Sequence, residues 1–146
     1  MRDMVQNHLL QLVSLVAMES PNKMSADNIR TEKIKVLQAL RPIIGEEVRT
    51  HTVSGQYVAG NVDEKLEPGY LEELAQTSDK TSSRTETFVA IRAFIDNWRW
   101  SKVPFYLRTG KRLARRSAEI TIQYKSISHN AFDSDAGALS PNRLVI

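Results

Sequence analysis

The sequence predicts an α+β fold in which an antiparallel β-sheet packs against helices. Two segments with helical periodicity come first, and the later β-prone segments follow one another without a helix between them. Successive strands without crossover helices pair as antiparallel neighbours. The 146 residues fit one domain, and a hydrophobic content of 41% is enough for a core. We therefore expect residues 1–146 to form a single α+β domain.

The first helix is expected over residues 2–19. On a helical wheel the polar side is interrupted by apolar residues, which is typical of a helix largely enclosed by protein. Ser20 and Pro21 should end it, because proline cannot continue a helix and restricts the residue before it. The apolar side is formed by Met4, Val5, Leu9, Leu12, Leu15 and Val16.

The second helix is expected over residues 25–40. Ser25 suits the N-cap, Asp27 places a carboxylate in the first turn, and Pro42 closes the segment. A polar loop is expected over residues 59–84, between the first two strands. The expected strands are residues 47–58, 85–95, 103–113, 118–124 and 144–146.

The composition argues against several classes of site. There is no cysteine, so disulfides and thiolate metal sites cannot form, and a cytoplasmic location is expected. The three histidines, at positions 8, 51 and 129, are too scattered to favour a zinc site. The apolar run over residues 12–18 is too short to span a bilayer, and a net charge of +3 does not indicate nucleic acid. The six glycines form no phosphate-binding loop of the Rossmann type.

His8 is the first candidate for chemistry. It falls inside the apolar side of the first helix, between Leu12 and Leu15, where we expect it to be buried. A buried histidine with a carboxylate partner can act as a general base, although a structural histidine with satisfied ring nitrogens is the commoner case. We do not expect a simple pair with Asp3, which in an α-helix lies about 140° away around the axis and roughly 7.5 Å along it. The residues alone leave both roles of His8 open.

A basic cluster follows the third expected strand and is the second candidate. Lysine and arginine at a strand end suit a phosphate, because both stay charged and arginine can hold two oxygens. A solvated strand edge is an equal alternative, since positive charges there prevent unwanted pairing. A nucleic-acid site with Trp98, Trp100 and Tyr106 as stacking partners is weaker, because the tryptophans are expected to cover the sheet. The cluster consists of Arg108, Lys111, Arg112, Arg115 and Arg116.

Several motifs in combination resemble the glucose-6-phosphate dehydrogenase family. Residues 2–19, which read RDMVQNHLLQLVSLVAME, resemble the family's helix that holds the catalytic histidine. The resemblance is specific because its landmarks keep the family's order and cover essentially the whole chain. Those landmarks are EKIKVL at 32–37, GQY at 55–57, GY at 69–70, RW at 99–100 and VPFYLRTGKRL at 103–113.

The resemblance implies the oxidation of glucose 6-phosphate to 6-phosphogluconolactone, with hydride passing from C1 to NADP in the oxidative pentose phosphate pathway. His8 matches the general base that removes the C1 hydroxyl proton, assisted by an aspartate from another part of the chain. The position of Asp3 implies an acceptor for the sugar hydroxyls. Lys111 and Arg116 match basic residues that orient and neutralise the phosphorylated sugar. A second, structural NADP site is not implied, because Ser117 and Thr121 replace its basic residues.

The resemblance also implies that the chain is an internal part of the C-terminal, substrate-binding domain. The family's nucleotide-binding domain and the aspartate partner of the histidine have no match here. NADP would therefore be bound mainly outside these residues, and the chain alone is expected to be inactive. Self-association through the sheet, from Val48 onward, is implied as well. The alternative from another class is a non-catalytic module of the same fold that binds a sugar phosphate or another subunit.

Overall fold

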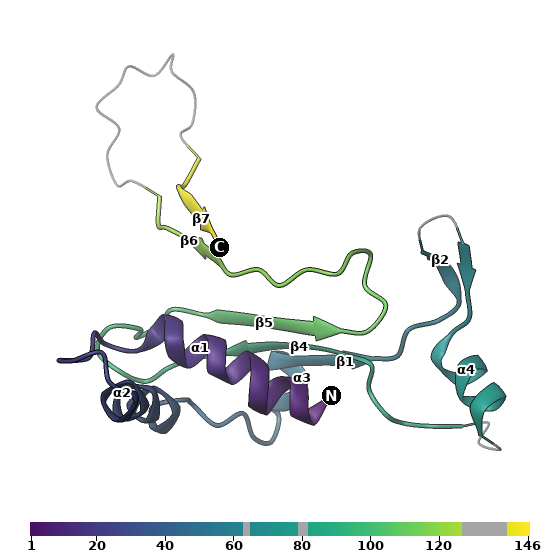
Figure 1. Ribbon diagram of the computed structural model, residues 1–146, viewed down its shortest axis with the longest axis horizontal. Coiled ribbons are helices and arrows are strands. Elements are labelled where there is room, and N and C mark those ends of the chain that lie inside the picture. Colours follow the sequence, from purple (N-terminus) through teal and green to yellow (C-terminus); the bar gives the residue numbers. More distant parts are fainter. Residues whose placement is uncertain (63–64, 79–81, 127–139) are drawn as a thin grey trace, which may run out of the picture. The chain divides into compact units, whose positions relative to one another are not determined.

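The computed structural model describes residues 1–62, 65–78, 82–126 and 140–146. The chain divides into two compact units, Met1–Leu113 and Ala114–Ile146, where the sequence predicted one domain. Figure 1 shows helices α1 and α2 together with the sheet of β1, β4 and β5 in the first unit. The antiparallel strands and their helices confirm the predicted α+β class.

The first helix has two differently wound parts. Its opening part, η1 (Met4–Leu9), is a π-helix, and it continues directly into the α-helix α1 (Leu10–Ala17). The Leu10 N–H donates to the Val5 carbonyl, which is the i→i+5 bond of π-winding. The backbone turns extended at Met18, before the predicted breaker Pro21.

Helix α2 (Ala26–Gln38) lies where the second helix was predicted and packs against α1. Its N-cap is Ser25, whose hydroxyl oxygen accepts from the Asn28 N–H at 3.4 Å. Asp27 lies in the first turn and Lys35 in the last, so both charges suit the helix dipole.

The segment predicted as a strand over residues 47–58 is only partly a strand. Its beginning forms the short helix α3 (Glu47–His51), and strand β1 covers Thr52–Gly55. Threonine side chains support the helical turn: the Thr50 hydroxyl donates to the Glu47 carbonyl and the Thr52 hydroxyl to the Val48 carbonyl. These local bonds override the β-propensity on which the prediction depended.

The sheet of the first unit has the order β1, β4, β5 with antiparallel pairing throughout. Strand β4 (Phe88–Ala93) is central, with Thr52 opposite Ile91 on one side and Leu107 opposite Ile91 on the other. Strand β5 (Phe105–Gly110) ends where Gly110 pairs with Phe88. A Cβ at Gly110 would come within 2.9 Å of the Phe88 ring, so the close strand pairing requires glycine there.

The polar stretch 59–84 is not a plain loop. It contains the antiparallel hairpin of β2 (Gly60–Val62) and β3 (Lys65–Glu67), followed by helix α4 (Tyr70–Thr77), whereas residues 63–64 and 79–81 lie outside the described residues. The Glu72 carboxylate accepts from the Gly69 N–H at 3.1 Å and so closes the first turn of α4. The prediction failed because this helix is short and polar in composition.

The core of the first unit lies between the helices and the sheet. Trp100 packs edge-on against Phe105, with ring centroids 5.1 Å apart, and its indole N–H donates to the Ala17 carbonyl at 2.9 Å. Trp98, in contrast, is fully exposed, so the expectation that both tryptophans cover the sheet is wrong for Trp98. The buried core residues are Val13, Ala17, Val36 and Ile95.

The second unit contains one antiparallel pair, β6 (Thr121–Gln123) with β7 (Arg143–Val145). Both strands overlap the last two predicted segments, 118–124 and 144–146. Ile120 and Ile146 extend the ladder by exchanging backbone hydrogen bonds of 2.9 and 3.0 Å. In the described ranges of both units, no helix is long and apolar enough to cross a membrane.

Candidate functional site

His8 lies on the last turn of η1, and its side chain is 60% exposed. The prediction that it would be buried is therefore wrong. No residue of η1 is buried, and even Leu12 and Leu15 of α1 are 39% and 47% exposed. The apolar arc that surrounds His8 on the helical wheel is thus only partly covered by the described elements of the chain. An exposed ring is free to meet a ligand.

Asp3 lies next to His8, which also corrects the expectation from α-helical geometry. Its carboxylate oxygen Oδ2 is 3.9 Å from Nε2 of His8, and the other oxygen, Oδ1, accepts from the Asn7 amide at 2.5 Å. The physical reason is the winding of η1, because i→i+5 hydrogen bonding brings residues five positions apart to the same side. The π-turn therefore presents an imidazole and a carboxylate together.

Lys111 follows the last residue of β5, and β5 lies beside η1. Figure 1 shows the N-terminal helix beside the sheet that contains β5, and η1 contacts this strand. The Lys111 N–H donates to the buried Thr87 carbonyl at 2.8 Å, which fixes its backbone, while its side chain is exposed. Asp3 and His8 therefore lie at η1, and Lys111 directly follows the strand that contacts η1.

Arg116 belongs to the second unit, where its side chain is exposed. Its neighbour Arg115 pairs with Glu119 at 3.3 Å within the same unit. The substrate role of Arg116 stays a prediction from the resemblance.

Arg112, which sequence reasoning did not assign, is the most connected residue of the basic cluster. Its guanidinium donates to Glu67 at 2.8 Å and to Glu73, and it lies over the Tyr57 ring with 5.6 Å to the centroid. The Tyr57 hydroxyl also donates to Glu73, and this hydrogen bond raises the pKa of Tyr57 and lowers the pKa of Glu73. The sequence drew attention to Arg112 only as a member of the basic cluster, and gave no sign of its contacts with Glu67 and Glu73.

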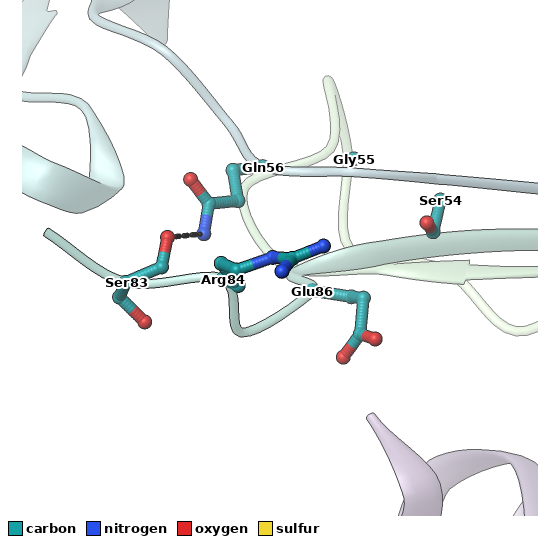
Figure 2. A pocket seen from close by; sticks show the side chains of 6 residues that line it. All are labelled: Ser54, Gly55, Gln56, Ser83, Arg84 and Glu86. Carbon is teal, nitrogen blue, oxygen red and sulfur yellow. Dashed lines mark hydrogen bonds between the residues drawn. The ribbon is translucent and has the colours of Figure 1, made fainter.

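A separate polar hollow of about 560 Å³ opens beside the end of β1 and contains none of the predicted site residues. Figure 2 shows the Gln56 side chain turned toward Ser83 at its wall. The Gln56 amide donates to the carbonyls of Ser83 and Thr85, both at 2.8 Å, so its donor group is already satisfied. Arg84 and Glu86 also line the hollow.

The described residues offer no site for a metal or a dinucleotide. No group of three or more histidine and carboxylate side chains converges among them, and His129 lies outside the described residues. The sheets are antiparallel, and Gly69, the glycine between strand β3 and helix α4, donates its N–H to the Glu72 carboxylate.

Comparison with known proteins agrees with the resemblance. A relative from Zymomonas mobilis, glucose-6-phosphate 1-dehydrogenase, is 57% identical over 146 residues, and the same enzyme of Rhizobium meliloti is 56% identical. The chain spans 29% of the length of each. The solved structure of a glucose-6-phosphate dehydrogenase in complex with its substrate glucose 6-phosphate matches 99% of this chain and 27% of its own, with a TM-score of 0.81 and 39% identity.

The family model of the glucose-6-phosphate dehydrogenase C-terminal domain matches residues 1–146. The resemblance inferred from the motifs is thereby confirmed for the entire sequence. This chain belongs to the glucose-6-phosphate dehydrogenase family, within its C-terminal domain.

Proposed function

We propose that this chain forms part of the substrate site of a glucose-6-phosphate 1-dehydrogenase, which oxidises glucose 6-phosphate to 6-phosphogluconolactone and reduces NADP. The observation that carries the proposal is the exposed π-turn of η1, on which His8 and Asp3 lie 3.9 Å apart. The activity named for the relatives and the substrate named for the matched structure support it.

His8 is the proposed general base. In the reaction, the C1 hydroxyl proton passes to a ring nitrogen of His8 while the C1 hydride leaves to NADP, and the carbonyl of the lactone forms. A positioned base of this kind contributes about 10²–10⁴ in rate. The resulting imidazolium is stabilised by carboxylate charge, and Asp3 supplies one such group on the same turn. The aspartate partner implied by the family would add a second from outside this chain.

Asp3, Lys111 and Arg116 are the proposed substrate-binding residues. The Asp3 carboxylate keeps acceptor capacity after its bond to Asn7 and is 72% exposed, so it can accept from sugar hydroxyls. The exposed ammonium of Lys111 supplies a compact positive charge for the phosphorylated sugar, and Arg116 a planar one. In the first unit, Asp3 and Lys111 hold the sugar so that C1 faces the base. The role of Arg116, which belongs to the second unit, is proposed from the resemblance alone.

The complete enzyme that carries this chain tests the proposal. It should reduce NADP with glucose 6-phosphate and much more weakly with glucose, because glucose lacks the phosphate that Lys111 and Arg116 recognise. Lys111→Thr should raise the KM for glucose 6-phosphate about tenfold, which corresponds to the loss of one charge-assisted hydrogen bond. The matched control is Lys23→Thr, in the exposed turn between α1 and α2. An unaltered KM in Lys111→Thr would contradict the role of this residue.

Residues 1–146 alone should not reduce NADP, because the hydride acceptor is proposed to bind elsewhere in the polypeptide. NADP reduction by the isolated chain would refute the proposal that NADP binds outside these residues. Retention of glucose 6-phosphate binding with no dehydrogenase activity in the full reading frame would instead favour a non-catalytic module.

We place the enzyme in the cytoplasm, in keeping with the absence of cysteine.

We also propose that the enzyme self-associates through its sheet. Strands β1 and β5 are the edges of the described three-stranded sheet, and Val53 and Tyr106 on them are 64% and 74% exposed. Sedimentation of the complete enzyme should give a species larger than one chain, and Tyr106→Lys should shift it toward the monomer. A monomeric complete enzyme would rule this out.

A further inference from the structure

Arg112 adopts a backbone conformation that is unusual for its residue type. Its φ is +51°, in the left-handed region that favours glycine, and it comes two residues after Gly110 at the end of β5. A non-glycine residue stays there only when surrounding contacts over-determine it. The guanidinium supplies such contacts by joining Glu67 of β3 to Glu73 of α4. Arg112 is thus held by elements far from it in the sequence.

Lys111 lies in the field of one of these carboxylates, that of Glu73. The positive charge of Lys111 contributes to lowering the pKa of Glu73, after the larger effects of Tyr57 and Arg112. The backbone of Lys111 is fixed by its N–H bond to the Thr87 carbonyl, and the Thr87 hydroxyl in turn accepts from the Tyr57 N–H at 2.9 Å. The backbone position of Lys111 is therefore fixed, and only its side-chain conformation can change.

The charges of Glu67, Glu73 and Arg112 determine where the Lys111 ammonium lies. Glu67 and Glu73 carry two negative charges, and the fork of Arg112 neutralises part of both through charge-assisted hydrogen bonds. Without Arg112, two carboxylates would remain beside an ammonium on a flexible stem. Lys111 would then pair with a glutamate, since opposite charges a few ångströms apart attract and the side chain has the freedom to reach.

We propose that Arg112 is a positioning residue that occupies Glu67 and Glu73 and thereby leaves the Lys111 ammonium available to the phosphorylated sugar. This inference rests on the proposed function, in which Lys111 binds glucose 6-phosphate. Arg112 itself does not touch the substrate. The bond from Tyr57 to Glu73 completes the arrangement, because it orients one of the two carboxylates that Arg112 holds.

The test uses the complete enzyme and steady-state kinetics with glucose 6-phosphate. Arg112→Ala should raise the KM about tenfold, comparable to the loss of Lys111 itself, with kcat changed less than about twofold. The decisive variant adds Glu67→Gln and Glu73→Gln to Arg112→Ala: removal of both negative charges should return the KM to within about threefold of the wild-type value. The melting temperatures separate this role from a merely structural one, because a positioning role raises the KM of folded Arg112→Ala without a matching change in stability.

Arg115→Ala is the matched control, because it removes the same charge from the same basic cluster but pairs only with Glu119 among the described residues. Its KM should stay within about twofold of the wild-type value. If Arg112→Ala is not folded, Arg112→Gln keeps most of the side-chain length and serves in its place, with the same expected KM increase and the same rescue.

The outcomes separate this inference from the proposed function. A raised KM in Lys111→Thr with an unchanged KM in Arg112→Ala overturns the positioning role alone. An unchanged KM in Lys111→Thr overturns the substrate role of Lys111 and the inference with it. A KM that stays high after both glutamates are neutralised shows that Arg112 acts by some means other than occupying them, which also overturns the inference.

Discussion

The first helix of this chain has two consecutive parts that differ in winding and in burial. The π-helical part, η1, buries none of its residues, whereas the α-helical part, α1, buries Val13, Ser14 and Ala17. Val13 and Ala17 face Val36 and Ile95 in the core. His8 and Asp3, in contrast, are exposed on the outer turn. The same helix therefore serves stability at one end and is proposed to serve chemistry at the other.

The difference in winding has a chemical consequence. In an α-helix, Asp3 and His8 would point in different directions, but the π-turn brings them to 3.9 Å. Because η1 contributes no residue to the core cluster, its π-winding does not disturb the packing of that core. The comparison predicts that substitutions in η1 affect activity and substitutions in α1 affect stability.

His8→Asn is expected to have the largest effect. In the complete enzyme it should lower kcat about 10²–10⁴-fold, with little change in the KM, because the base is lost and the substrate contacts remain. The melting temperature should stay close to that of the wild type, since His8 is exposed. An unchanged kcat would remove the base assignment.

Val13→Ala tests the other end of the helix. Val13 is 5% exposed, and loss of two buried carbon atoms with the resulting cavity should lower the free energy of unfolding by about 2 kcal/mol. Denaturant titration measures this change. The kcat of the folded variant should be that of the wild type. A large loss of turnover without loss of stability would break the division between the two parts.

Asp3→Asn should have a smaller effect, on binding and, through the lost charge beside His8, on kcat. The amide keeps one acceptor but loses the negative charge, so the KM for glucose 6-phosphate should rise about tenfold or less. The free energy of unfolding should change by less than about 0.5 kcal/mol, because the residue is exposed and outside the core. If stability fell by several kcal/mol instead, Asp3 would belong with the structural part of the helix.

Local signals predicted well those elements whose ends carry caps and breakers. Helix α2 begins at the Ser25 cap and ends before Pro42, and strands β4 and β5 lie inside the predicted segments. Helix α4 was missed because it is short and its sequence is polar, so composition alone suggested a loop. Helix α3 contains the β-branched residues Val48 and Thr50, and its turn is held by backbone hydrogen bonds and by threonine hydroxyls that donate to nearby carbonyls.

The sequence named the candidate site residues, whose roles stay predictions, and it could not predict their geometry. The motifs around His8 and Lys111 identified the family, because their order along the chain can be read from the sequence without a structure. The wheel could not anticipate π-winding, since the apolar pattern of η1 is the same for both helix types. The role inferred for Arg112 depends on Glu67 and Glu73, and contacts over such sequence separations exist only in the folded chain.

Chemical rescue tests the central proposal, that His8 is the base, most directly. His8→Ala in the complete enzyme removes the imidazole and leaves space on an exposed turn. Added imidazole should restore NADP reduction in proportion to its concentration, and it should not restore Lys111→Thr, in which the base is intact. A folded His8→Ala enzyme that retains wild-type turnover without imidazole, or that binds substrate but gains no activity with it, would contradict the proposal.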